Sequence, residues 1–162
     1  MNLTIREIGA DEFSLAWPLF REVVAAGDTY SYAPDTTFEE ARELWTCHGA
    51  RCFVALSGDA CVGAYVLKPN QPGLGNRVAN AGYMVVPALR GRGVAGAMCE
   101  HSIERAREAG FRAMQFNFVV TTNEGAVRLW QKHGFAIVGR VPRAFRHARL
   151  GMTDVFVMHR DL

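Results

Sequence analysis

The chain contains Tyr83-Met84-Val85-Val86-Pro87-Ala88-Leu89-Arg90-Gly91-Arg92-Gly93-Val94-Ala95-Gly96 just past its midpoint, so an apolar strand leads through a basic, glycine-rich loop into the start of a helix. Such a loop directs successive backbone N–H groups at one point, and glycine keeps Cβ atoms away from it. The helix macrodipole adds partial positive charge at the same place. This stretch therefore predicts a binding site for an anion the size of a pyrophosphate.

Two classes of ligand fit such a loop. Residues 91–96 match G-x-G-x-x-G, the dinucleotide fingerprint, which also requires an acidic residue about 20 positions further on. The next predicted strand, 113–119, instead continues into Val120-Thr121-Thr122 without an acid. Too little chain follows to complete a dinucleotide-binding sheet. A dinucleotide site is therefore the weaker alternative.

A second pattern overlaps the loop. Residues 90–95 match Arg-x-x-Gly-x-Ala, and residues 123–135 match N-x-x-A-x-x-L-W-x-x-x-G-F. In this order and at this separation, the two segments resemble the coenzyme A pyrophosphate loop and a later segment of the GNAT N-acetyltransferase superfamily. The resemblance implies acetyl-CoA as the cosubstrate and no metal.

Hydrophobic periodicity and turn residues predict the element order β-α-α-β-β-β-α-β-α-β-β. This order resembles the GNAT fold of the α/β (α+β) class, a mixed, mostly antiparallel sheet of about seven strands that is flanked by four helices and splayed in the middle. Pro18 either kinks the first helix or starts a new one. We expect strands at 3–7, 51–56, 60–67, 78–86, 113–120, 135–141 and 154–159, and helices at 13–27, 37–49, 93–110 and 124–133.

Length and composition predict a single domain over residues 1–162, because a chain of this size buries about two-thirds of its unfolded surface without metal or disulfide. The net charge of +2 is too small to indicate nucleic-acid binding. No apolar window reaches the ~18 residues of a membrane span, and no signal-type segment begins the sequence. The four cysteines lack C-x-x-C spacing, which favours reduced core thiols. We expect a cytoplasmic protein without membrane or nucleic-acid partners, with a homodimer left open.

The resemblance also assigns coenzyme contacts. The loop from Arg90 to Gly96 would hold the pyrophosphate, and backbone groups of Tyr83, Met84 and Val85 would hold the pantetheine and the thioester carbonyl. Asn123 would touch the coenzyme, although helix N-capping alone also explains an asparagine there.

Trp130 departs from the family pattern, because many relatives have at this position a tyrosine that protonates the leaving thiolate. An indole N–H has no titratable proton near neutral pH, so we expect Trp130 to pack against the coenzyme or the core. His101 and His133 are the candidate proton donors in its place, and solvent is the alternative.

The attacking amine must lose a proton, yet the predicted strands 78–86 and 113–120 contain no Asp or Glu. They contain Asn80 and Asn117 instead. Segments 79–83 and 116–123 resemble a GNAT subgroup that includes the yeast azetidine-2-carboxylate acetyltransferases, where asparagines replace a carboxylate base. The resemblance implies that Asn80 orients the acceptor amine and that Asn117 supports Asn80 or a water. The alternative is that both amides satisfy backbone groups at a β-bulge.

For the acceptor, we expect contacts from Tyr30 and Tyr32 in an early loop and from Arg143 and Arg146 in a basic loop between the last two strands. Arginine can hold a carboxylate at two points, so a small amino acid would fit. The arginines have two alternative interpretations, a solvated loop and a contact with the outer phosphate of the coenzyme.

The predicted reaction is acetyl transfer from acetyl-CoA to a primary or secondary amine of a small molecule, such as an amino acid or a proline analogue, directly within a ternary complex. A ping-pong route is disfavoured, because Cys99 falls on the core stripe of its helix. A non-catalytic acyl-CoA sensor on the same fold is the competing class, and a protein or peptide acceptor is a further alternative.

Overall fold

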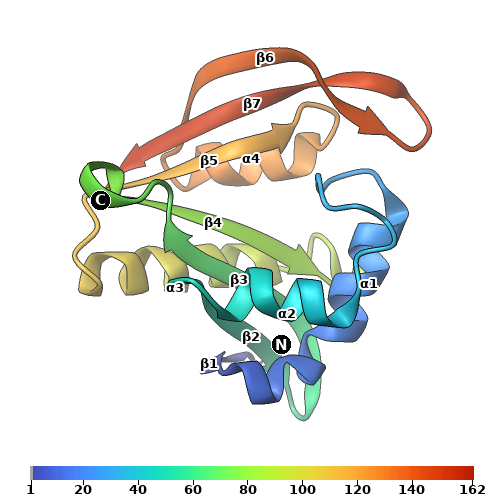
Figure 1. The fold of residues 1–162 in the computed structure, drawn as a ribbon, viewed down its shortest axis with the longest axis vertical. Coiled ribbons are helices and arrows are strands. Elements are labelled where there is room, and N and C mark those ends of the chain that lie inside the picture. The colour runs from blue at the N-terminus through green and yellow to red at the C-terminus, as the bar shows by residue number, and fades with distance from the viewer. Residues whose placement is uncertain (1) are drawn as a thin grey trace.

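The computed structural model describes residues 2–162 and contains one open, seven-stranded sheet (Figure 1). The strand order is β1-β2-β3-β4-β5-β7-β6, and every neighbouring pair is antiparallel except β4 and β5. The predicted mixed, mostly antiparallel sheet is thus confirmed. The strands are Thr4–Ile8 (β1), Arg51–Ser57 (β2), Ala60–Pro69 (β3), Val78–Val85 (β4), Ala113–Val120 (β5), Ala136–His147 (β6) and Gly151–Asp161 (β7).

Four α-helices cover the two faces of the sheet, as predicted. They are Trp17–Ala26 (α1), Phe38–Thr46 (α2), Val94–Glu108 (α3) and Glu124–Lys132 (α4), with 3-10 turns at Ala10–Leu15, Gly73–Gly75 and Pro87–Leu89. One buried cluster joins α1 and α2 to the sheet, and a second joins α3 and α4 to the opposite face. The first helix begins at Trp17 rather than Phe13, because Pro18 fits the first turn of a helix and not its interior.

The sheet opens between β4 and β5. Only Val78↔Ala113 and Ala79↔Met114 are paired, after which the two parallel strands diverge (Figure 1). Along β4, Tyr83 and Val85 pack with the cluster of α3 and α4, whereas Met84 packs with the cluster of α1 and α2. Residues of β4 beyond the last pair therefore expose backbone groups to the opening and side chains to both sides of it.

The last two strands are much longer than predicted. The expected basic loop is a hairpin in which β6 reaches His147 and β7 starts at Gly151. Arg143 has a φ of 50° within an irregular stretch of the β6–β7 pairing, and its N–H donates to Asp154 Oδ1 at 2.8 Å. At the hairpin tip, the N–H of Ala148 donates to the carbonyl of Gly27 at 2.9 Å. The hairpin thus holds the loop that follows α1.

Across residues 2–162, no helix is long and apolar enough to cross a membrane.

Candidate active site

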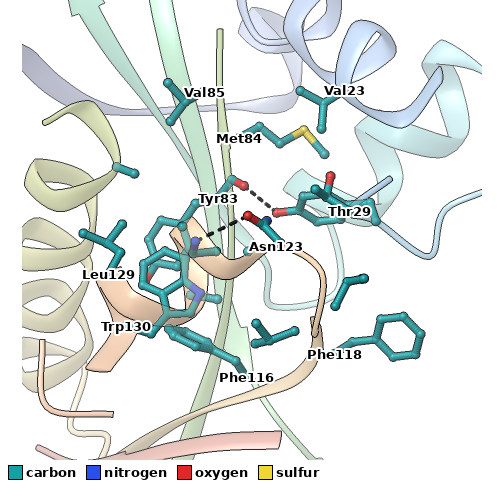
Figure 2. Close-up of a pocket in the computed structure, with 18 of the residues that line it drawn as sticks. Val23, Thr29, Tyr83, Met84, Val85, Phe116, Phe118, Asn123, Leu129 and Trp130 are labelled. Carbon is teal, nitrogen blue, oxygen red and sulfur yellow. Dashed lines mark hydrogen bonds between the residues drawn. The ribbon is translucent and has the colours of Figure 1, made fainter. Parts of the chain in front are cut away.

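The opening between β4 and β5 is part of a cleft of about 760 Å³. Figure 2 shows Leu129 and Trp130 on one side, Val23 and Thr29 on the other, and Tyr83 between them. Most of the predicted site residues line this cleft: Tyr30, Tyr32, Asn80, Tyr83, Met84, Val85, Arg90, Gly91, Gly93, Ala95, Gly96, Asn117, Asn123 and Trp130.

Four predicted residues do not line it. Arg92 lies outside, and Val94 is 1% exposed with its side chain in the core, so only its backbone could face a ligand. Arg143 and Arg146 lie on β6 outside the cleft, because the expected loop is a strand. The structure therefore does not bring these two arginines into the cleft with the other predicted acceptor contacts, Tyr30 and Tyr32.

One end of the cleft is the glycine loop at the start of α3. Gly91 and Gly93 have φ values of 77° and 88°, which glycine adopts without strain. Gly93 is the N-cap of α3 and no side chain caps the helix, so its first N–H groups have no side-chain acceptor. Together with Arg90, this geometry suits a pyrophosphate.

The middle of the cleft is the edge of β4 at Tyr83. Its carbonyl accepts a hydrogen bond from the Tyr30 hydroxyl at 2.8 Å (Figure 2). The hydroxyl of Tyr83 lies 2.7 Å from Ser102 Oγ. A Cβ atom on Gly82 would lie 3.0 Å from the Tyr30 hydroxyl, so glycine there admits the phenol. Burial raises the pKa of Tyr30 and of Tyr83 well above the usual range for tyrosine. Both phenols are neutral hydrogen-bonding groups near pH 7.

Trp130 packs as predicted. Only 8% of it is exposed, and its ring centroid lies 4.8 Å from that of Tyr83 and 5.0 Å from that of Phe116. The candidate proton donors do not reach the cleft: His101 Nδ1 lies 2.7 Å from the Tyr65 hydroxyl, and His133 Nδ1 lies 2.9 Å from the carbonyl of Leu129. Neither histidine is placed to protonate a thiolate there.

Asn123 lines the cleft and also caps α4. Its Oδ1 accepts from the N–H of Ala126 at 3.3 Å (Figure 2). The capping interpretation is confirmed, and contact with a coenzyme remains a prediction.

Asn80 lies at the fork where β4 and β5 separate. If the parallel pairing continued, Asn80 would be the next residue to pair with β5, opposite Gln115. Instead, its side-chain Nδ2 donates to the backbone carbonyl of Gln115 at 3.0 Å. The Gln115 side chain donates to Asn117 Oδ1 at 3.0 Å, and Asn117 donates to Asn70 Oδ1 at 2.6 Å. Asn80 and Asn117 are thus linked through Gln115 and not directly. The Oδ1 of Asn80 has no hydrogen-bond partner within residues 2–162.

Sequence reasoning missed three polar residues of the cleft, Lys68, Thr29 and Ser31. Lys68 pairs across β3 and β4 with Asn80, and only this register reveals that it belongs to the site. The hydroxyl of Thr29 is buried and has no partner within the described chain. Among residues 2–162, no Asp, Glu, His or Cys lines the cleft. Cys99 is also unsuited to a ping-pong route, because burial raises its pKa to about 12.

The structure is an open α/β sheet with a cleft at its fork and, at one end of the cleft, a helix N-terminus that no side chain caps. The model of the Acetyltransferase (GNAT) family matches residues 13–135. The chain belongs to this family, and the class of enzyme that the family defines is an acetyl-CoA-dependent acetyltransferase.

Individual relatives agree with this membership. A GCN5-related N-acetyltransferase from Kribbella flavida is 45% identical with a TM-score of 0.92, over 99% of this chain and 98% of that one. N-acetyltransferase aca1 of Schizosaccharomyces pombe is 31% identical over 59% of this chain, which spans only 46% of that relative. A phosphinothricin acetyltransferase from Sinorhizobium meliloti, solved with acetyl-CoA, shares the fold at 23% identity and a TM-score of 0.85, over 100% of this chain and 89% of that one.

Proposed function

We propose that this chain transfers an acetyl group from acetyl-CoA to the amine of a small molecule, an amino acid or a proline analogue, in a ternary complex. The observation that carries the proposal is the continuity of the cleft. It runs without interruption from the glycine loop at α3, past the free edge of β4, to Asn80 at the fork. A ligand with a pyrophosphate at one end and a thioester at the other fits that shape.

The proposed role of each residue follows from its position along the cleft. Arg90 and the N–H groups at the start of α3 would bind the pyrophosphate, and the β4 edge near Tyr83 would hold the extended arm by strand-like hydrogen bonds. Tyr30, Tyr32 and Asn80 lie on the side left for the acceptor. Asn80 Oδ1 would accept a hydrogen bond from the attacking amine, as the resemblance to the azetidine-2-carboxylate acetyltransferases also suggests.

The chemistry is a direct displacement. The amine nitrogen forms the new C–N bond to the acetyl carbon, the C–S bond breaks, and the thiolate leaves. An amide is a poor base, so the amine proton passes to water while Asn80 only orients the nitrogen. The coenzyme A thiolate is weakly basic and takes its proton from solvent, because no histidine or carboxylate among residues 2–162 lines the cleft.

The test is acetyl-CoA-dependent release of free thiol with a panel of small amines that includes azetidine-2-carboxylate. Turnover that needs both acetyl-CoA and an amine supports the proposal. Tight binding of acetyl-CoA without thiol release for any amine would contradict it and would favour a non-catalytic acyl-CoA sensor. If peptides were acetylated and no small amine was, the acceptor would be a protein or peptide and not a small molecule.

A further inference from the structure

Lys68 is a cationic side chain that lines the cleft and has no anionic partner among residues 2–162. It is half-buried on β3 and lines the cleft, and no carboxylate oxygen of residues 2–162 lies within 4.0 Å of it. The chain has only one other lysine, Lys132 on α4. A partly buried ammonium without a protein counter-charge is stabilised when a ligand brings one.

The coenzyme pyrophosphate is too far along the strand to be that ligand. Lys68 pairs with Asn80, and the glycine loop begins only after Val85. Five residues of strand span about 16 Å. The anion that meets Lys68 therefore belongs to the molecule bound at the fork.

The position of Lys68 beside Asn80 suggests what that molecule is. Directly paired residues of antiparallel strands have Cβ atoms about 5 Å apart and point to the same face. Asn80 offers a free amide oxygen to an N–H donor, and Lys68 offers an ammonium group to an anion. An α-amino acid carries its amine and its carboxylate on a single carbon. The amine can therefore donate to the amide oxygen of Asn80 while the carboxylate accepts from the neighbouring ammonium group of Lys68.

Building on the proposed function, we infer that Lys68 binds the carboxylate of an amino-acid acceptor while Asn80 receives the N–H of its amine. Lys68 is then the residue that selects amino acids over simple amines. The assignment also places the carboxylate contact inside the cleft, where the basic hairpin of β6 and β7 does not reach.

The same contact helps the amine lose its proton. The charged and titratable groups that line the cleft are Tyr30 and Tyr32 before α2, Lys68 on β3, Tyr83 on β4 and Arg90 before α3. None of them is an anion at neutral pH, so the only negative charge near the acceptor ammonium is its own carboxylate. Pairing that carboxylate with Lys68 removes this stabilisation and lowers the pKa of the bound amine. The free amine then needs no carboxylate base, and its proton goes to water.

The experiment compares Lys68→Met with Lys132→Met, the same change at the other lysine, on two matched acceptor pairs. The pairs are azetidine-2-carboxylate with its carboxamide, and L-leucine with L-leucinamide. The wild type should prefer each acid over its amide. Lys68→Met should raise KM for the acids about 10- to 100-fold, the loss of one charge-assisted hydrogen bond, with little change for the amides. Lys132→Met should match the wild type, and Lys68→Arg should restore most of the preference.

The pH profile separates a charge contact from a structural effect. With an acid acceptor, the acidic limb of kcat, on which the rate rises as the bound amine loses its proton, should move to higher pH in Lys68→Met. With an amide acceptor it should not move. Equal use of acids and amides by the wild type, or an unchanged acid preference in Lys68→Met, would overturn the inference but leave acetyl transfer intact. Absence of thiol release with every amine would overturn the proposed function itself.

Discussion

Replacing Gly93 by glutamate tests the coenzyme site at its exposed glycine loop. Gly93 is the N-cap of α3 with a φ of 88°, and a Cβ atom there would meet nothing within 4 Å. Gly93→Ala therefore changes only the backbone preference, which costs about 1–2 kcal/mol of folding free energy. Gly93→Glu adds to that cost a negative charge at the position assigned to the pyrophosphate.

The expected loss of affinity follows from Coulomb's law. Two unit charges 4 Å apart repel by about 1 kcal/mol in water and about 4 kcal/mol at the effective dielectric near a protein surface. The loop is exposed, so repulsion between the new carboxylate and the two pyrophosphate charges should reduce the binding free energy by about 2–4 kcal/mol in total. This corresponds to a roughly 30- to 800-fold increase in Kd. Gly93→Ala should bind within a few-fold of the wild type.

Isothermal titration calorimetry measures the Kd of both variants for coenzyme A. Because the repulsion is between charges near the surface, the loss in Gly93→Glu should shrink as salt is raised from about 0.05 to 0.5 M. Equal affinity of Gly93→Glu and Gly93→Ala would refute the assignment of this loop. A loss that salt leaves unchanged would point to a distorted loop instead of charge repulsion.

Three further changes test other parts of the site. Asn80→Ala should lower kcat about tenfold or more and leave the Kd for coenzyme A within about twofold; an unchanged kcat would remove Asn80 from the mechanism. Gly82→Ala should cost about 1–2 kcal/mol in denaturant unfolding by displacing the Tyr30 hydroxyl from the carbonyl of Tyr83, and less in a Tyr30→Phe background; equal costs in both backgrounds would contradict this coupling. Cys99 has a pKa of about 12 and stays a protonated thiol at pH 8, so mass spectrometry should show slow alkylation of the native protein by iodoacetamide; rapid alkylation with loss of turnover would revive a covalent route.

The sequence sufficed for the parts of the fold in which one local pattern dominates. Alternating apolar residues locate β4, the Thr37 capping box locates α2, and Gly110 follows the end of α3. Each signal lies within a few residues of the element that it defines. The glycine loop was predictable for the same reason, because its function depends on consecutive backbone groups.

The β6–β7 hairpin was not predictable in the same way. Both strands carry exposed residues over much of their length, and arginines interrupt the apolar alternation of β6. A positive φ at Arg143, held by Asp154, shifts the register within β6. Pairing between the strands, and not the local sequence, therefore decides that this segment is a sheet.

The acceptor side of the site required tertiary information. Lys68 becomes a site residue only through its register with Asn80, twelve positions later in the chain. The link between Asn80 and Asn117 runs through Gln115, whose backbone and side chain bond different partners. Neither arrangement has a short-range signature, so reasoning along single strands could name the two asparagines but not their connection.

The most direct test of the central claim follows the acetyl group itself. The protein is incubated with acetyl-CoA labelled with carbon-13 in the acetyl group and with azetidine-2-carboxylate or L-leucine, and both the small molecules and the intact protein are analysed by mass spectrometry. The account predicts labelled N-acetyl product at a rate equal to thiol release, with no labelled protein at any time. Label that accumulates on the protein, or thiol release without a labelled amine, would contradict direct transfer to a small-molecule acceptor.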